Sequence, residues 1–349
     1  MVKKAENIIV GISVGDLNGI GSEVVLKTFE DIRMLELCTP VIFANVKIIS
    51  LLKKEFKLTA AIHGIDKIEQ LVLGKINVLN VWREGINLEF GKNDDFVGSY
   101  AIKSFVAATE ALKGGFVDVL VTAPINKYNI QSEDFKFPGH TDYLNKELTG
   151  DALMLMVHDD LRVGLLTDHV PVNEVAKNLT EKLISNKIHT VIKTLKQDFE
   201  IEKPKIAVLG LNPHSGDNGV IGDEEEKIMK PALKKLFDAG NLVFGPFSAD
   251  GFFGSAQYEK YDAVIATYHD QGLIPFKTLS FGNGVNYTAG LDKIRTSPDH
   301  GTAYEIAGKG IANHESFKKA VYLAIDIYDK RNEYNELIKN PLKTKEKQL

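Results

Sequence analysis

The sequence predicts an α/β protein whose sheet is largely parallel. Short apolar runs rich in Val, Ile and Leu alternate along the chain with longer segments in which apolar residues recur at helical spacing. This alternation is typical of strands joined by helical crossovers. Two of the runs, 152–157 and 264–267, are almost entirely apolar, which is the composition of strands covered on both faces.

These two patterns place the elements in order along the chain. Strands are expected at 7–14, 40–45, 76–81, 117–123, 152–157, 161–167, 204–211, 241–245 and 262–268. Helices are expected at 20–35, 98–113, 179–196, 222–238 and 315–330. The polar segment 126–137 and the glycine-rich segment 282–290 are expected to cross between two domains. The polar tail 330–349 is expected to fray from the last helix.

Composition excludes several classes of protein. The chain has 349 residues, enough for two domains, and its net charge of −5 gives no basic field for a nucleic-acid backbone. The single cysteine, Cys38, cannot form an intrachain disulfide, which fits a reducing compartment. No signal peptide is evident, and no run reaches the ~18 apolar residues of a membrane span. We therefore expect a cytoplasmic protein that binds neither nucleic acid nor membrane.

Three of the expected strands run directly into a histidine. His169, His214 and His269 follow the strands at 161–167, 204–211 and 262–268. Ligands of open parallel sheets bind beyond the carboxyl ends of the strands, so these imidazoles can point into one space. Three imidazoles with an open fourth position suit a catalytic Zn²⁺, Co²⁺ or Ni²⁺. Alternatively, each histidine separately caps its strand.

Acidic and basic side chains lie near the same strand ends. Asp250 follows one expected strand, Asp270 adjoins the third histidine, and Lys277, Asn286 and Arg295 come further along. An arginine offers a planar fork for carboxylate or phosphate, so the group suits an anionic substrate beside a metal. The alternative is that Lys277 and Arg295 are ordinary surface charges.

Two glycine-rich turns are open to more than one interpretation. Segment 15–23 follows a strand and opens a helix, where backbone N–H groups could bind phosphate or where a tight turn could simply need positive φ. Segment 300–313 is rich in small residues that would let a ligand approach the backbone. There Glu305 could accept from ribose hydroxyls, which favours NAD over NADP.

With these residues, the sequence resembles the 4-hydroxythreonine-4-phosphate dehydrogenase family of pyridoxal 5′-phosphate biosynthesis. The matching blocks span residues 15 to about 313: Gly15-Asp16, Gly19-Ile20-Gly21 and Glu23; Thr122-Ala-Pro-Ile-Asn-Lys127; Gly139-His-Thr141; Gly210-Leu-Asn-Pro-His-Ser-Gly216; Gly245-Pro-Phe-Ser-Ala-Asp250; His269-Asp-Gln-Gly272; Gly284-Val-Asn286; Arg295-Thr-Ser; and Asp299-His-Gly-Thr-Ala303. The first turn departs from the family pattern, because Leu17, Asn18 and Ser22 replace Pro, Ala and a second Pro.

The resemblance implies a fold like that of isocitrate and isopropylmalate dehydrogenases, with two α/β domains around a central cleft. Residues 1–125 and 295–349 would form the NAD-side domain, and 126–294 the domain for metal, substrate and dimerisation. The working unit would be a homodimer with a shared active site, in which one of the three histidine ligands comes from the partner subunit.

The resemblance also assigns roles to residues. The metal (Zn, Co or Mg) would be held by His169, His214 and His269. Substrate would be bound by His140, Thr141, Lys277, Asn286 and Arg295. NAD would be bound by His300, Gly301, Thr302, Ala303, Glu305 and Asn313. Catalytic roles would fall to Asp250, Asp270 and Lys277, and either aspartate or a metal-bound water could be the general base.

The implied reaction is NAD-dependent oxidation of 4-phosphooxy-L-threonine at C3, followed by loss of CO₂ to give 3-amino-2-oxopropyl phosphate. A paralogous dehydrogenase of 4-phospho-D-threonate or 4-phospho-D-erythronate is the nearest alternative. A metal-binding module without redox activity and a phosphotransacetylase-like acyltransferase are more distant ones. The intact segment 300–313 disfavours the former, and the latter would not need three histidines at strand ends.

Overall fold

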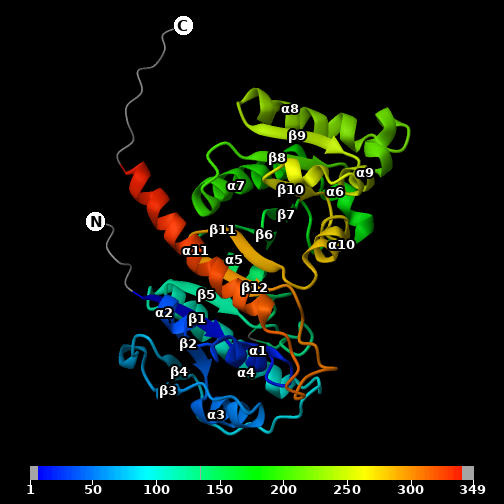
Figure 1. Ribbon diagram of the computed structural model, residues 1–349. Coiled ribbons are helices and arrows are strands. Elements are labelled where there is room, and N and C mark those ends of the chain that lie inside the picture. Colours follow the sequence, from blue (N-terminus) through cyan, green and yellow to red (C-terminus); the bar gives the residue numbers. More distant parts are fainter. Residues whose placement is uncertain (1–6, 134, 340–349) are drawn as a thin grey trace.

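A computed structural model describes residues 7–133 and 135–339 as a mixed α/β fold around one twelve-stranded sheet (Figure 1). Its strands are β1 (Ile8–Ser13), β2 (Cys38–Ala44), β3 (Ile62–Ile65), β4 (Ile76–Asn80), β5 (Val119–Thr122), β6 (Gly150–His158), β7 (Leu161–Leu165), β8 (Lys205–Leu209), β9 (Leu242–Phe247), β10 (Ala263–Ala266), β11 (Val285–Leu291) and β12 (Ile294–Pro298). They lie in the order β3-β4-β2-β1-β5-β12-β11-β6-β7-β10-β8-β9. The predicted α/β class is confirmed.

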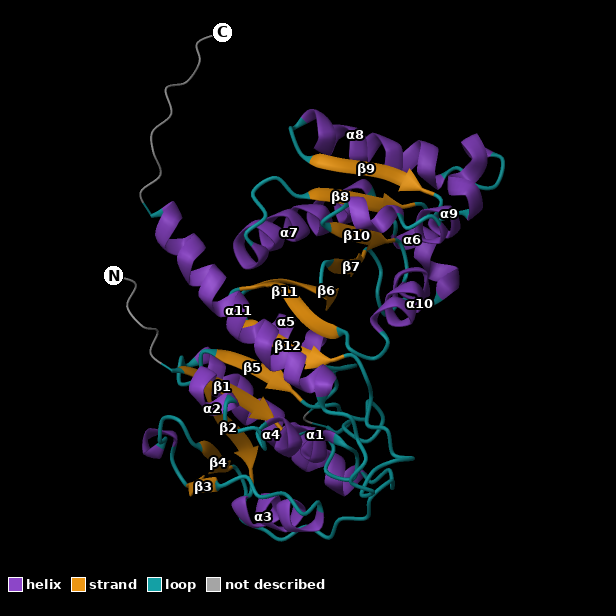
Figure 2. Cartoon of the chain, in the orientation of Figure 1, coloured by secondary structure: helices purple, strands orange, loops and turns teal. Residues whose placement is uncertain are grey.

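The sheet consists of two parallel halves joined through an antiparallel centre. Pairing is parallel from β3 to β12 and from β7 to β9, while β12–β11, β11–β6 and β6–β7 pair antiparallel. Because sheets twist along their width, the arrowheads of β1 and β5 and those of β8 and β9 point to the same side of the molecule (Figure 2). The carboxyl ends of the parallel strands in both halves therefore lie on the same side of the molecule.

Helices cover both faces of the sheet. They are α1 (Gly21–Thr28), α2 (Met34–Leu37), α3 (Val46–Glu55), α4 (Asp95–Lys113), α5 (His140–Glu147), α6 (Val175–Asn178), α7 (Glu181–Phe199), α8 (Lys230–Asp238), α9 (Ala249–Gly254), α10 (His269–Ser280) and α11 (Glu315–Ile338). The sequence sets several helix starts: Asn45, Asp94 and Thr180 each accept hydrogen bonds from backbone N–H groups of the first turn.

The last helix, α11, holds the two halves of the sheet together. It packs on β5, β11 and β12 and lies beside α7. Arg331 of α11 is buried and donates to both carboxylate oxygens of buried Asp198, at 2.8 and 3.0 Å. The hydroxyl of Tyr287 on β11 donates to the same carboxylate at 2.6 Å. This buried ion pair ties α7, α11 and the sheet centre to one another.

The sequence-based strands are confirmed at all nine positions, but three strands and five helices were missed. Strand β3 is short and half-polar, β11 lies in the segment predicted as a glycine-rich crossing, and β12 follows it closely. The missed helices are α3, α5, α6, α9 and α10. Helices α6 and α9 are only four and six residues long, and α10 contains Pro275, which obscures a helical pattern.

The predicted ends of two helices were wrong. The expected helix at 20–35 is split into α1 and α2, and α11 continues to Ile338 instead of fraying from 330. Residues 340–349 of the predicted tail lie outside the described residues. No helix in the described ranges is long and apolar enough to cross a membrane.

Candidate active site

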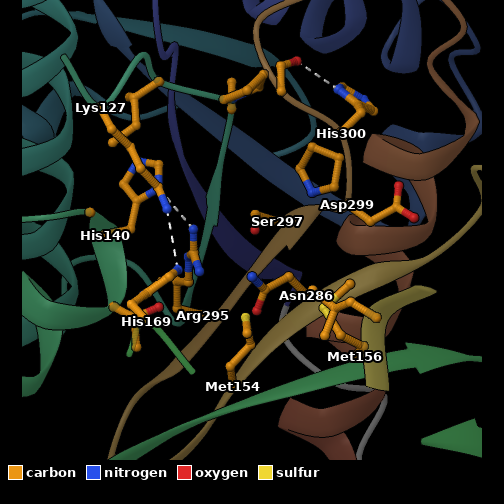
Figure 3. Close-up of a pocket in the computed structure, with 18 of the residues that line it drawn as sticks. Lys127, His140, Met154, Met156, His169, Asn286, Arg295, Ser297, Asp299 and His300 are labelled. Carbon is orange, nitrogen blue, oxygen red and sulfur yellow. Dashed lines mark hydrogen bonds between the residues drawn. The ribbon is translucent and has the colours of Figure 1, made fainter. Parts of the chain in front are cut away.

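A cavity of about 310 Å³ opens where the two halves of the sheet meet. Its wall comes from the carboxyl ends of β5 and β7, the N-terminal turns of α5 and α10, and the central strands β6, β11 and β12. The side chains that line it include Lys127, His140, Thr141, Asp142, Met154, Met156, His169, His269, Lys277, Asn286, Arg295, Ser297, Asp299 and His300. Figure 3 shows how many of them converge from different elements.

Arg295 of β12 is a buried cation in this wall, with 2% of its surface exposed. Its guanidinium donates to the Thr122 hydroxyl at 3.0 and 2.5 Å and to the Thr288 hydroxyl at 3.2 Å. It forms no ion pair with a carboxylate of the described residues. Burial therefore lowers the pKa of Arg295 below its ordinary range, and an anion brought into the cavity would compensate the charge.

His140 connects Arg295 to the cavity. Its Nδ1 lies 3.0 Å from Nη2 of Arg295, and because a guanidinium can only donate, Nδ1 accepts. Burial, followed by the charges of Arg295 and Lys127, holds the pKa of His140 well below its usual value. The neutral ring therefore carries its hydrogen on Nε2, a buried atom without a hydrogen-bond partner among the described residues. It is available to donate to a ligand.

The other predicted substrate residues also reach the cavity. Thr141 lies in the first turn of α5, Lys277 on α10 and Asn286 on β11, and all three line the wall. The Oδ1 atom of Asn286 is buried and has no partner among the described residues. With Arg295 and His140, these residues thus offer two cations and several polar atoms to one ligand.

Two of the three predicted metal ligands come together in one chain. The rings of His169 and His269 have centroids 6.2 Å apart, and both line the cavity. The carboxylate of Asp270 lies 2.7 Å from Nδ1 of His269; a carboxylate accepts, so Nδ1 donates and Nε2 is left with its lone pair. Burial, then the charge of Lys127, lowers the pKa of His169, which favours the neutral, metal-binding form.

The third histidine, His214, does not line the cavity of its own chain. It lies exposed on the turn Pro213–Gly219, where successive residues have positive φ. Within the ranges 7–133 and 135–339, no three His, Cys, Asp or Glu side chains of one chain are arranged to hold a metal ion. Parallel β7, β10 and β8 do bring all three histidines to one sheet edge, but they spread along it.

The two aspartates predicted as catalytic lie outside the cavity wall. Asp250 is exposed at the start of α9 and accepts from the Ser248 hydroxyl at 2.6 Å, a contact that lowers the pKa of Asp250. The Asp270 carboxylate contacts Nδ1 of the His269 ring and not the Nε2 atom that carries the free lone pair. Its geometry suits an orienting residue rather than a base in contact with substrate.

Lys127 is a cavity residue that the sequence analysis missed as a site residue. It lies five residues beyond the end of β5, on the segment interpreted only as a domain crossing. Its Nζ is 3.2 Å from Nε2 of His169. The rule that ligands bind beyond strand ends could have identified it, because β5 is central and parallel to both of its neighbours.

The predicted cofactor segment 300–313 forms a loop that packs on the turn before α1. The amide of Ile20 donates to the Thr302 carbonyl at 3.0 Å, and the amide of Ala312 donates to buried Glu23 at 2.8 Å. Glu305 and Asn313 are exposed, as is Gly301, while Ala303 has a φ of 45°. Asn313 also accepts from the first amide of α11.

The turn 15–21 packs tightly against two segments, the one that follows β5 and the loop 300–313. Gly15 has a φ of +66°, and a Cβ there would lie 2.3 Å from the Pro124 carbonyl oxygen; a Cβ on Gly19 would lie 2.8 Å from that of Thr302. The structure therefore favours the tight-turn interpretation over the phosphate-binding one.

The fold is that of a class of dehydrogenases with solved structures. The 4-hydroxythreonine-4-phosphate dehydrogenase of Klebsiella pneumoniae superposes with a TM-score of 0.77 at 32% identity, over 94% of this chain and 99% of that chain.

The family follows from the sequence comparisons. The family model described as pyridoxal phosphate biosynthetic protein PdxA matches residues 36–324. The 4-hydroxythreonine-4-phosphate dehydrogenase of Bacteroides thetaiotaomicron is 46% identical over 96% of this chain and 92% of its own length. A relative in Cutibacterium acnes, named as a candidate D-threonate 4-phosphate dehydrogenase, is 35% identical over 91% of this chain and 93% of its own length. The chain belongs to the PdxA family.

Proposed function

We propose that this protein is the NAD-dependent dehydrogenase of 4-phosphooxy-L-threonine, acting at C3 with loss of CO₂. Its closer relatives bear the name of that enzyme. The observation that carries the proposal is Arg295, a buried cation without a carboxylate partner among the described residues, in the wall of the cavity. A site of this kind selects an anionic substrate.

Different residues of the cavity would bind different groups of the substrate. Arg295 and Lys277 would bind its anionic oxygens, and the Nε2–H group of His140 and the hydroxyl of Thr141 would donate to the same groups. Asn286 offers an amide that can both donate and accept. The side chains of Met154 and Met156 give the floor an apolar surface that helps to exclude water.

The imidazoles of His169 and His269 fit a divalent metal of the kind that nitrogen ligands favour, such as Zn²⁺ or Co²⁺. The Asp270 contact orients the His269 ring as second partners of metal-bound histidines commonly do. His214, exposed and outside its own cavity, would complete the site of a second copy, so we infer a homodimer with shared sites. The bound metal would supply a Lewis acid for the substrate oxygen.

The loop 300–313 would hold NAD, which accepts the hydride. Glu305 would meet the ribose, with His300, Gly301, Thr302, Ala303 and Asn313 around it. This loop belongs to the half that we assign as the NAD-side domain, 1–125 with 295–349, and 126–294 would form the other. The candidates for the general base are Asp250, Asp270 and a metal-bound water; since neither aspartate lines the cavity, either one would act from outside its wall.

One assay tests the proposal directly. NADH formation should be measured with 4-phosphooxy-L-threonine, D-threonate 4-phosphate and 4-phospho-D-erythronate, each with and without a chelator. We expect the highest kcat/KM with the first substrate, loss of activity on chelation and recovery with Zn²⁺ or Co²⁺. NADH formation with none of the three would refute the proposal. Preference for D-threonate 4-phosphate would support the alternative suggested by the relative in Cutibacterium acnes.

A further inference from the structure

Lys127 occupies a position in the cavity that the roles proposed so far leave unused. Its side chain reaches from the segment after β5 toward His169, and the two nitrogen atoms are 3.2 Å apart (Figure 3). Arg295 and His140 lie beside this pair in the same wall. Lys127 lines the cavity although it stays exposed to solvent, and its charge contributes to the lowered pKa of both histidines.

The backbone that carries Lys127 is fixed on both sides. The Asn126 carboxamide oxygen accepts from the amides of Tyr128 and Asn129 at 2.9 and 3.4 Å. The Asn129 carboxamide donates to buried Asp16 at 2.7 Å. Tyr304 of the loop 300–313 donates to the same Asp16 oxygen at 2.7 Å. Hydrogen bonds therefore fix the segment that places the Lys127 ammonium group at the cavity. A fixed backbone of this kind is what substrate positioning requires.

The contact between Lys127 and His169 competes with the proposed metal. An ammonium group only donates, so Nε2 of His169 accepts, and a metal ion would use the same lone pair. Two cations cannot share it, and a lysine beside a divalent metal is repelled unless an anion lies between them. Lys127 is exposed, and no carboxylate of the described residues forms an ion pair with it, so an anionic oxygen of a ligand can take the position between the ammonium and the metal.

We propose that Lys127 is a further substrate-binding residue, which contacts an anionic carboxylate or phosphate oxygen of the substrate when His169 holds the metal. This inference rests on the proposed function. Lys127, Lys277 and Arg295 together give the cavity three positive charges. A phosphorylated carboxylic acid carries about three negative charges, which these cations would balance. The two carboxylates in the wall, Asp142 and Asp299, remain available for a substrate ammonium group.

The test compares the full-length wild-type holoenzyme with Lys127→Met, Lys127→Arg and Lys136→Met. Lys136 is an exposed lysine of the same segment that does not line the cavity, so its variant is the matched control. For each protein, KM and kcat for 4-phosphooxy-L-threonine, the metal content, and the inhibition constant of inorganic phosphate would be measured. Calorimetric titration with the substrate without NAD gives binding independently of turnover.

We expect Lys127→Met to raise KM and the substrate Kd by roughly ten- to hundredfold, the range for a lost charge-assisted hydrogen bond. Metal content should be retained, Lys127→Arg should restore part of the affinity, and Lys136→Met should match the wild type. A parallel rise in the phosphate inhibition constant would identify the phosphate as the group bound, and an unchanged constant the carboxylate. Unchanged KM and Kd in Lys127→Met would overturn the inference, as would a loss of metal without a change in Kd. An inactive wild type would instead refute the proposed function.

Discussion

Two buried arginines of this chain should respond to the same substitution in opposite ways. Arg295 lies in the cavity wall and, among the described residues, donates to hydroxyls and an imidazole but to no carboxylate, whereas Arg331 is paired with the Asp198 carboxylate at 2.8 and 3.0 Å. Arg295→Met should cost activity and little stability. Arg331→Met should cost stability and leave kcat/KM of the folded enzyme largely unchanged.

The magnitudes follow from the contacts. Loss of two charge-assisted hydrogen bonds to the substrate, at ~1.5–3 kcal/mol each, predicts a fall in kcat/KM of at least about a hundredfold for Arg295→Met. Leaving Thr122 and His140 without their donor costs ~1–3 kcal/mol. Removing a buried charge that has no carboxylate partner stabilises the folded state by a similar amount. The two effects oppose each other, so the free energy of unfolding should change by no more than about 1–2 kcal/mol. Arg331→Met leaves the buried Asp198 carboxylate without its cation and should lower the free energy of unfolding by ~3–5 kcal/mol.

The assay is urea denaturation beside steady-state kinetics on the same preparations. The reasoning would be refuted if Arg295→Met lost as much stability as Arg331→Met, because Arg295 would then be a structural residue. It would equally be refuted if Arg295→Met kept its kcat/KM.

Three further predictions test the loop, the turn and the buried imidazole. Asp16→Asn should raise the Kd for NAD about tenfold, because one carboxylate oxygen of Asp16 accepts from Tyr304 and Asn129, the other accepts from the Asn18 amide, and an asparagine has only one accepting oxygen; a fluorescence titration that matches the wild type would contradict this. Gly15→Ala should lower the free energy of unfolding by at least about 3 kcal/mol, since its Cβ would meet a carbonyl oxygen at 2.3 Å in addition to the positive φ. The control Gly74→Ala has the same sign of φ and open space and should lose only about 1–2 kcal/mol; equal losses in urea would exclude the clash as the cause. The pKa of His140 is lowered in the folded state. Below about pH 6.5 the unfolded chain therefore takes up a proton that the folded chain does not. The free energy of unfolding should then fall as the pH drops below 6.5, by at most ~1.4 kcal/mol per pH unit. His140→Gln should flatten this part of the stability curve, and a curve as steep as that of the wild type would assign the effect to other groups.

The sequence alone determined the fold class and the side of the sheet that carries the site. Strands such as 152–157 and 204–211 are identified by local periodicity, which depends on neighbouring residues only. The same locality explains why His169, His214 and His269 could be assigned to strand ends, and why His140, Lys277, Asn286 and Arg295 could be named as candidates through the family pattern.

Only the tertiary structure decided which of these residues meet. Strands β11 and β12 are recognisable from their partners β6 and β5 rather than from their own short, partly polar sequences. Their pairing buries Arg295, which has no carboxylate partner among the described residues. The distance between His214 and the other two histidines, and the approach of Lys127 to His169, depend on sheet order and on contacts between residues far apart in the chain. Composition and periodicity carry no information on such pairings, because burial and charge compensation arise from packing between segments and not within them.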